Sequence, residues 1–182
     1  MTQALETPAS VPAVPAGMPV VDNHQYLTFS VCGEVFAIGI LNIKEIIEYG
    51  SVTEIPMMPA FIRGVINLRG AVVPVIDLSV RFGRQPTQIA RRTSIVIVEV
   101  AHEGGKQDIG IVVDAVHEVL EITARDIEPP PAFGAKIRTD FIQGMGKVND
   151  KFVILLNVDR VLSVEEMALL TGLDGHSAQV PA

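Results

Sequence analysis

The sequence has little of what most secreted, membrane-spanning and carbohydrate-binding proteins need. Its 182 residues include one cysteine, no tryptophan and 5% aromatic residues. A single cysteine, Cys32, excludes an internal disulfide framework. Few aromatic side chains argue against stacking platforms for sugars or bases. Uncharged apolar runs are all shorter than the roughly 18 residues that a membrane-spanning helix needs, so we expect no direct membrane insertion.

Basic residues are also scarce. The formal net charge is −7, and residues 1–22 contain no lysine or arginine. Such a chain is not drawn to phosphate backbones, so we expect no nucleic-acid partner. A secretory signal begins with a basic region and a transit peptide carries arginine, so the start of the chain is typical of neither. We expect a cytoplasmic protein in which residues 1–22, with four prolines, form a flexible leader.

Motifs for metal and nucleotide chemistry are missing as well. No two of the four histidines are three or four residues apart, and none lies near the cysteine. The stretch Gly144-x-Gly146 lacks the third glycine of a dinucleotide loop. Asp77 and Asp114 each end an apolar strand, which would suit paired acid–base carboxylates if they met. We favour instead that each binds backbone N–H groups of the next turn, and we predict no catalytic residue, no metal and no cofactor.

What the chain does contain is an internal repeat. Four short blocks occur in the same order in both halves, at an offset of about 71 to 80 residues. The blocks of the first half are residues 36–40, 45–48, 61–64 and 72–78, and those of the second half are 108–111, 118–121, 141–144 and 152–158. This period is too long for a solenoid. The repeat predicts two similar β modules, with a groove for a binding partner where they meet.

The apolar stretches indicate strands. Hydrophobic residues make up 48% of the chain and occur in short runs rich in valine and isoleucine. About ten such runs separated by turn signals predict two closed barrels of five strands each. Residues 41–48 fit either a short helix or an extended segment. Pro74 lies inside a predicted strand, which implies a sheet edge or a bulge.

Turn and cap residues suggest where each part begins and ends. We expect a first barrel over 23–88 and a second over 89–163, to which the N-terminal strand can also contribute. Ser163 and Glu166 form a capping box that predicts a helix over 164–172. Residues 173–182 would then be a tail.

One stretch, residues 64–78, holds the most specific candidate for recognition. Arg69 lies between strand residues and Gly70, and its side chain is either a solvated turn arginine or a recognition group held at a groove. Arginine is enriched at interfaces because its planar guanidinium is pre-organised. Glu45, among the isoleucines of 43–47, is the second candidate.

This stretch resembles a known family. Gly64-Val-Ile-Asn-Leu-Arg-Gly70, followed by Val-Ile-Asp-Leu78 and Phe82-Gly83, is similar to the signature of the CheW family of bacterial chemotaxis coupling proteins. The resemblance also covers residues 40–47, 55–62, 110–114 and 165–170, and so spans roughly residues 25 to 170.

The resemblance implies both a fold and a function. The fold is all-β, with two five-stranded SH3-like barrels packed together, a hydrophobic groove between them and a short C-terminal helix. The function is a non-catalytic scaffold that couples the cytoplasmic tips of chemoreceptors to the regulatory domain of the histidine kinase CheA. The residues implied are the receptor-coupling arginine at Arg69, its acidic partner at Glu45, groove positions Ile43 and Val119, and the shaping glycines Gly64, Gly70 and Gly110.

Three alternatives remain open on the sequence. The same module serves systems for twitching or swarming motility. An enzyme using Asp77, Asp114 or a histidine would gather titratable groups with perturbed pKa values in a pocket. A small-ligand barrel would enclose a deep cavity, whereas an adaptor groove is apolar and shallow.

Overall fold

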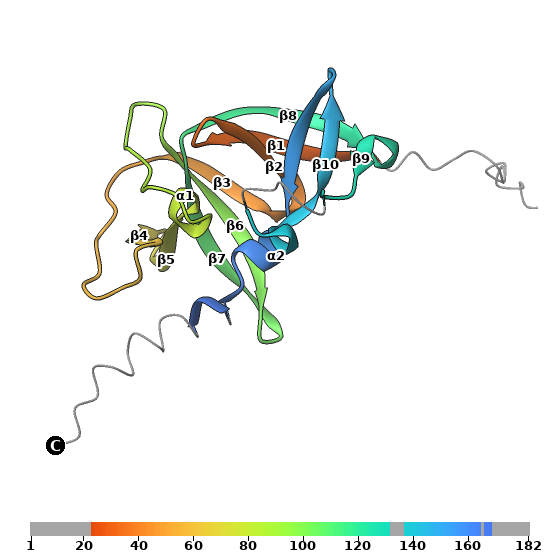
Figure 1. Cartoon of the computed structure of the whole chain (residues 1–182). Helices are drawn as coiled ribbons and strands as arrows, with labels where there is room; N and C mark the ends of the chain where they lie inside the picture. Colours follow the sequence, from red (N-terminus) through yellow and green to blue (C-terminus); the bar gives the residue numbers. More distant parts are fainter. Residues whose placement is uncertain (1–22, 132–136, 165, 169–182) are drawn as a thin grey trace, which may run out of the picture.

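The computed structural model describes residues 23–131, 137–164 and 166–168, and most of their regular structure is β-strand (Figure 1). The strands are β1 (Asn23–Val31), β2 (Glu34–Gly39), β3 (Ile43–Glu48), β4 (Ile62–Leu68), β5 (Ala71–Asp77), β6 (Ser94–His102), β7 (Gly105–Val113), β8 (Ala115–Thr123), β9 (Ile127–Glu128), β10 (Ile142–Val148) and β11 (Lys151–Leu156). The helical elements are α1 (Leu78–Arg81), α2 (Val158–Val161) and the 3-10 turns η1 (Ile40–Asn42), η2 (Ala124–Asp126) and η3 (Thr139–Phe141). Within the described ranges, no helix has the length and apolar character to span a membrane.

The strands form two sheets. The first sheet has the order β3-β6-β7-β5-β4, and the second has the order β8-β1-β2-β11-β10-β9. Neighbouring strands are antiparallel, except that β5 pairs with β7, and β11 with β2, in parallel. In Figure 1 the second sheet occupies the upper right of the molecule and the first sheet lies below and to its left. The predicted all-β class is confirmed.

The internal repeat is visible in the sheets, but the two copies exchange strands. β3, β4 and β5 of the first sheet correspond in order and pairing to β8, β10 and β11 of the second. The first sheet takes β6 and β7 from the second half of the chain, and the second sheet takes β1 and β2 from the first half. The division of strands between the two sheets therefore does not follow the expected boundary between residues 23–88 and residues 89–163. The contribution of the N-terminal strand to the second sheet extends to the whole β1–β2 hairpin.

All four tight hairpins use the same turn. Each connects its strands through two residues with positive φ, which is the geometry of a type I′ turn and matches the twist of the strands. The turn pairs are Cys32–Gly33, Arg69–Gly70, Glu103–Gly104 and Asn149–Asp150. Glycine, asparagine and aspartate at these positions are the residues that adopt left-handed backbone most readily.

Pro74 lies in β5, which is an internal strand and not an edge. The backbone N–H and C=O of Val65, the residue opposite Pro74, both bond to Thr53. Pro74 therefore faces its β4 partner at a position without hydrogen bonds. The pairing of β5 with β7 begins only at Val75. The missing proline N–H consequently breaks no ladder bond, and the bulge expected near it occurs in β4, between Ile62 and Gly64.

Three apolar clusters hold the fold together. One lies inside the first sheet and includes Val75, Ile95 and Ile97, and a smaller one lies inside the second sheet around Ile122 and Leu155. The largest contains residues of both sheets and of α1, α2 and η3, and we call it the shared core. Because it joins both halves of the chain, the two sheets stabilise each other by burying apolar surface between them.

Each sheet curls back on itself in the way that an SH3-like barrel does. In the first sheet, Thr53, beyond the end of β3, forms a bridge to Val65 of β4. In the second, β9, beyond the end of β8, pairs with Met145 and Gly146 of β10. Among the strands that the structure describes, only these short bridges join the edges of each sheet, and the outer strands form no full ladder. The sheets have five and six strands, so the predicted full closure of two five-stranded barrels is not found in the described residues.

The C-terminal segment starts as the capping box predicts. Ser163 Oγ accepts a hydrogen bond from the backbone N–H of Glu166 at 3.3 Å, and the carbonyl of Ser163 accepts one from Met167 at 2.9 Å. The rest of the helix expected over 164–172, the leader 1–22 and the tail 173–182 lie outside the described residues.

Candidate functional site

Arg69 occupies the first left-handed position of the β4–β5 turn, at φ 51°, and Gly70 follows at φ 85°. Asn67 Oδ1 accepts a hydrogen bond from the backbone N–H of Gly70 at 2.8 Å, which pins the turn. The Arg69 side chain is 81% exposed, and its Nη2 lies 3.3 Å from Oε2 of Glu45. An exposed ion pair adds only about 0–1 kcal/mol to stability. The guanidinium is therefore fixed at its base and open to a partner at its tip.

Glu45 lies on β3, the outer strand of the first sheet, and not on a helix. A bulge between Ile43 and Glu45 shifts the register of β3 against β6. Glu45 is paired with Ile97 of the inner cluster, whereas Ile43 is paired with Val98 of the shared core. Ile43 thus lies on the side of the sheet that carries the shared core. Ile46, which is opposite Val96, lies on that side too and is half-exposed.

Val119 lies on β8, the outer strand of the second sheet. It is paired with Leu27, and Val116 is paired with Phe29, and both partners belong to the shared core. Val119 is half-exposed. The two outer strands therefore each present apolar side chains on the shared-core side. We call Ile43, Ile46, Val116 and Val119 the junction strip.

Sequence reasoning missed two members of the junction strip, Ile46 and Val116. Strand alternation alone would put Ile46 on the opposite side from Ile43, because the residues are three apart. The bulge in β3 restores them to one side. A similar irregularity in β8 brings Val116 and Val119 to one side. The isoleucine-rich composition of 43–47 was the only signal in the sequence.

The three glycines of the resemblance have separate places in the first sheet. Gly70 completes the Arg69 turn. Gly64 has φ 148°, and a Cβ there would overlap the carbonyl oxygen of Thr53, so the barrel closure needs glycine at this point. Gly110 is paired with Ile97, and a Cβ there would lie 2.8 Å from Cγ2 of Ile95 in the inner cluster.

The two carboxylates considered for acid–base chemistry are both bound by the fold. Asp77 is fully buried and accepts hydrogen bonds from the backbone N–H of Ser79 and of Thr87, and from the Thr87 hydroxyl. Arg63 also donates to it, from Nε at 3.0 Å. Asp114 accepts a bond from the backbone N–H of Cys32 at 2.7 Å. Both thus bind backbone N–H groups, but only Asp77 binds the turn that follows its own strand, as predicted. Asp114 binds the turn of the distant β1–β2 hairpin.

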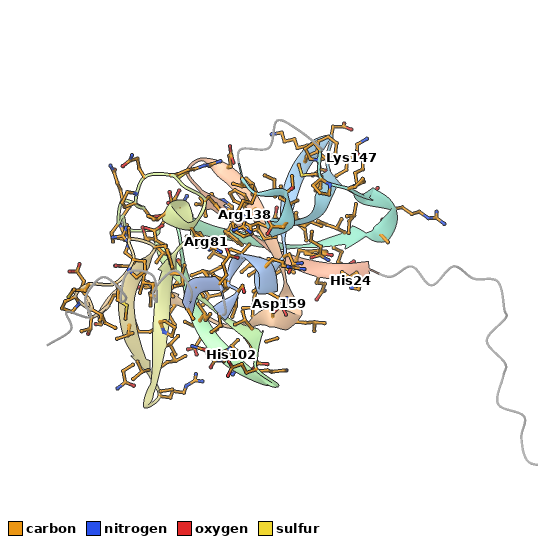
Figure 2. All side chains as sticks on the ribbon, turned by 60° about the horizontal axis from the view of Figure 1, so that its bottom comes forward. His24, Arg81, His102, Arg138, Lys147 and Asp159 are labelled. Atoms are coloured by element: carbon orange, nitrogen blue, oxygen red, sulfur yellow. The ribbon has the colours of Figure 1, made fainter. Side chains whose placement is uncertain are left out.

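A cluster of charged and aromatic side chains ties the two halves of the chain together, and no sequence motif indicated it. The guanidinium groups of Arg81 and Arg138 lie over the ring of Phe141, at 4.7 and 4.5 Å from its centroid. Both arginines also contact Oε1 of Glu166, Arg81 at 3.3 Å and Arg138 through a short hydrogen bond. Figure 2 shows the two arginines close together between the sheets. We call these four residues the arginine clasp.

Displaced pKa values occur in ion pairs of this kind. Burial pushes the pKa of Glu166 upward, but the hydrogen bond from Arg138 and the charge of Arg81 outweigh it and hold that pKa below its ordinary value. Hydrogen bonds to Asp108 and Glu99 raise the pKa of Lys44. Across the described part of the chain, no group of three or more histidine, cysteine or carboxylate side chains is arranged to hold a metal ion.

Comparisons with known proteins agree with this architecture. The model of the CheW-like domain family matches residues 25–166. Chemotaxis protein CheW of Klebsiella aerogenes is 39% identical over 148 residues, which cover 81% of this chain and 87% of that protein. Protein FrzA of Myxococcus xanthus is 32% identical over 124 residues, which cover 66% of this chain and 74% of that protein.

A solved structure is similar in fold and sequence. The crystal structure of scaffolding protein TtCheW from Thermoanaerobacter tengcongensis superimposes with a TM-score of 0.69 and 39% sequence identity, and the match covers 76% of this chain and 87% of that one. The chain has two β sheets that exchange hairpins between its halves, an arginine at the β4–β5 turn and a family match over most of its length. It belongs to the CheW-like domain family and is a scaffolding adaptor of chemotaxis signalling.

Proposed function

We propose that this chain acts in the cytoplasm as a non-catalytic bridge between the cytoplasmic tips of chemoreceptors and the regulatory domain of the histidine kinase CheA, without a cofactor. The observation that supports this most directly is the placement of Arg69. It is held by a tight turn and paired loosely with Glu45. Its partner Glu45 lies on the strand that also carries Ile43 and Ile46 of the junction strip.

The chemistry of this surface suits a receptor helix. A helix that docks on a protein surface uses apolar anchors spaced along one face, and polar groups at the rim set its register. Ile43 and Val119 are the proposed anchors, and Arg69 and Glu45 are the proposed rim. Because the rim pair contributes little to folding, its geometry serves the partner more than the fold.

A catalytic role has less support. Asp77 is buried and binds Ser79 of α1, Thr87 and Arg63 of β4, which leaves it unavailable to a substrate. A small-ligand barrel is also disfavoured, because the interior of the first sheet is filled by close-packed side chains of its own cluster. These observations favour partner binding at the surface over catalysis or ligand binding inside either sheet.

The module also suits another chemosensory pathway. The similarity to FrzA shows that proteins with names other than CheW share this domain. Twitching or swarming systems are therefore the second candidate. Deleting the gene and measuring movement up an attractant gradient, twitching and swarming separately would identify the pathway, and the gradient response should be the one lost if the chemotaxis proposal is right.

The proposal is tested with Arg69→Ala and a matched control, Asn149→Ala. Asn149 holds the corresponding left-handed position, φ 50°, in the β10–β11 turn. We expect Arg69→Ala to melt like the parent protein, and Asn149→Ala to melt slightly lower, because asparagine tolerates the left-handed region better than alanine does. Only Arg69→Ala should lower receptor-stimulated CheA activity, because the lost group contacts the receptor.

Two measurements are needed on the same samples, thermal melting and kinase activity reconstituted with a receptor tip fragment. A pull-down with the receptor fragment and CheA, separately and together, shows which contact fails. Unchanged stimulation in Arg69→Ala, or a loss explained by unfolding, would refute Arg69 as a receptor contact.

A further inference from the structure

A hollow of about 470 Å³ opens beside the junction strip, and we call it the end pocket. Its walls come from the start of β1, the turn η1, the end of β8 and the start of β10. The residues that line it are His24, Gln25, Tyr26, Gly39, Ile40, Leu41, Asn42, Glu121 and Gln143. Figure 2 shows His24 where the described chain enters β1, at the rim of this part of the molecule. The pocket forms because β2 ends at Gly39 while β1 extends further along β8.

The end pocket continues the junction strip on both of its sides. On β8, Glu121 is the next residue on the same side as Val119, since no irregularity interrupts the pairing between them. On the other side, η1 leads directly into Ile43, the first residue of β3. The distance from Val119 to Glu121 along the strand is about 6.6 Å, close to one helical turn of about 5.4 Å. A helix that contacts Val119 therefore reaches the pocket about one turn later.

The chemistry of the end pocket differs from that of the junction strip. Leu41 is 95% exposed, the most exposed large apolar side chain of the described residues. Beside it, the Glu121 carboxylate accepts a long 3.4 Å hydrogen bond from the amide of Gln25, its one side-chain hydrogen bond to a residue that the structure describes. None of the nine lining residues is a lysine or an arginine. The pocket thus offers an apolar anchor together with an acidic group that a cation would satisfy.

We propose that the end pocket receives the end of the same receptor helix that lies along the junction strip, an inference that rests on the proposed function. An apolar side chain of the helix packs against Leu41, and a lysine or arginine about one turn away pairs with Glu121. The contact surface is then longer than the family signature indicates, with an arginine at one end and an acidic pocket at the other. This polarity fixes the direction in which the helix binds.

The test compares each pocket variant with a matched substitution elsewhere. Leu41→Asp is compared with Met57→Asp, because Met57 is 87% exposed in the loop between β3 and β4. Glu121→Lys is compared with Glu103→Lys in the β6–β7 turn. The full-length chain is titrated with the soluble cytoplasmic fragment of a chemoreceptor, at low and high salt, and Ile43→Asp and Val119→Asp report on the junction strip itself.

We expect Leu41→Asp and Glu121→Lys each to weaken binding by about tenfold, the loss of one good contact, and both controls to stay within about twofold. Glu121→Gln should lower both the affinity and its dependence on salt. Loss of binding in Ile43→Asp and Val119→Asp, with Leu41→Asp and Glu121→Lys unchanged, would overturn the end pocket and leave the proposed function standing. If Ile43→Asp and Val119→Asp also bind normally, the proposed receptor site itself is wrong. An effect of Leu41→Asp without one of Glu121→Lys or Glu121→Gln would overturn the basic partner.

Discussion

The β4–β5 and β10–β11 hairpins have the same backbone plan and differ in the side chains exposed at their turns. Both begin with a bulge before a glycine, Gly64 in one and Gly144 in the other, and both turn through two left-handed residues. The turn of the first hairpin starts with Arg69 and that of the second with Asn149. The two hairpins therefore share a backbone plan, and the proposed recognition role of Arg69 would depend on a single side chain that differs at an equivalent position.

The short helices that follow the two hairpins differ in how strongly their N-terminal caps are bound. Asp77 caps α1 and also binds Thr87 and Arg63, so the chain after α1 is tied to the first sheet. Asn157 caps α2 through one bond of 3.3 Å to the N–H of Arg160. The hairpin that carries Arg69 is thus anchored through its last residue by a buried ionic cluster, and its counterpart is not.

Separating the two halves of the chain should have the largest effect. A fragment of residues 23–93 lacks β6 and β7, so the first sheet loses Ile95, Ile97 and Val112 of its apolar cluster. Small cores are marginal even when complete. We expect no cooperative unfolding of this fragment, and one calorimetric transition for the whole chain. Two well-separated transitions of the whole chain would show that the sheets fold independently.

The two caps should differ in their contribution to stability. Asp77→Ala removes the buried partner of Arg63, and breaking such a pair costs roughly 3–5 kcal/mol. Asn157→Ala removes only a helix cap, at a cost of about 1 kcal/mol. Urea unfolding of both variants measures the difference. Equal losses would mean that the Asp77 cluster adds nothing beyond capping.

The two bulge glycines offer a closer comparison. At Gly64 the φ of 148° and the overlap with Thr53 both oppose a side chain, so Gly64→Ala should cost about 3 kcal/mol. At Gly144 a Cβ would lie 2.6 Å from Cγ2 of Ile127 and 3.1 Å from the carbonyl oxygen of Glu128. The backbone there is not left-handed and both contacts are with the two-residue strand β9, so Gly144→Ala should cost less, about 2 kcal/mol. The denaturant midpoints of the two variants measure which substitution destabilises the protein more. A larger loss for Gly144→Ala would show that the closure of the second barrel is the stricter one.

The arginine clasp predicts the smallest effect, a dependence of stability on acid. The pKa of Glu166 is lower in the folded protein than its ordinary value of about 4.3. Its contribution to stability is therefore fully present above that value and is lost as the pH falls through the lower folded pKa. Glu166→Gln should make the melting temperature depend less on pH between pH 5 and pH 3. The change should be small because the side chain is partly exposed. A slope identical to that of the parent protein would exclude Glu166 as a contributor.

The sequence predicted the local features of this fold well, and the reason is physical. Turns with left-handed residues, such as Glu103–Gly104, follow from the chemistry of two or three neighbouring residues. The repeat predicted similar modules, and the family signature predicted the meeting of Arg69 and Glu45, which the structure places 3.3 Å apart. The segment over 41–48 stayed ambiguous because its isoleucines fit both periods, and pairing with β6 decided for a strand.

Pairings between distant strands could not be read from the sequence. The exchange of the β1–β2 and β6–β7 hairpins between the halves leaves every local pattern unchanged, since each strand has the same alternation in either sheet. The arginine clasp is hidden for a similar reason, because Arg81, Arg138 and Glu166 are far apart in the chain and follow no spacing rule.

The sequence by itself determined the strands, the tight turns, the duplicated plan and the arginine that marks the family, because each depends on residues close together in the chain or on a signature carried by them. Only the tertiary structure decided which hairpins pair, which side of β3 and β8 faces the shared core, and that an acidic pocket continues the junction strip. Those features depend on single-residue register shifts and on long-range burial, and a shift of one residue moves a side chain to the opposite face of its sheet.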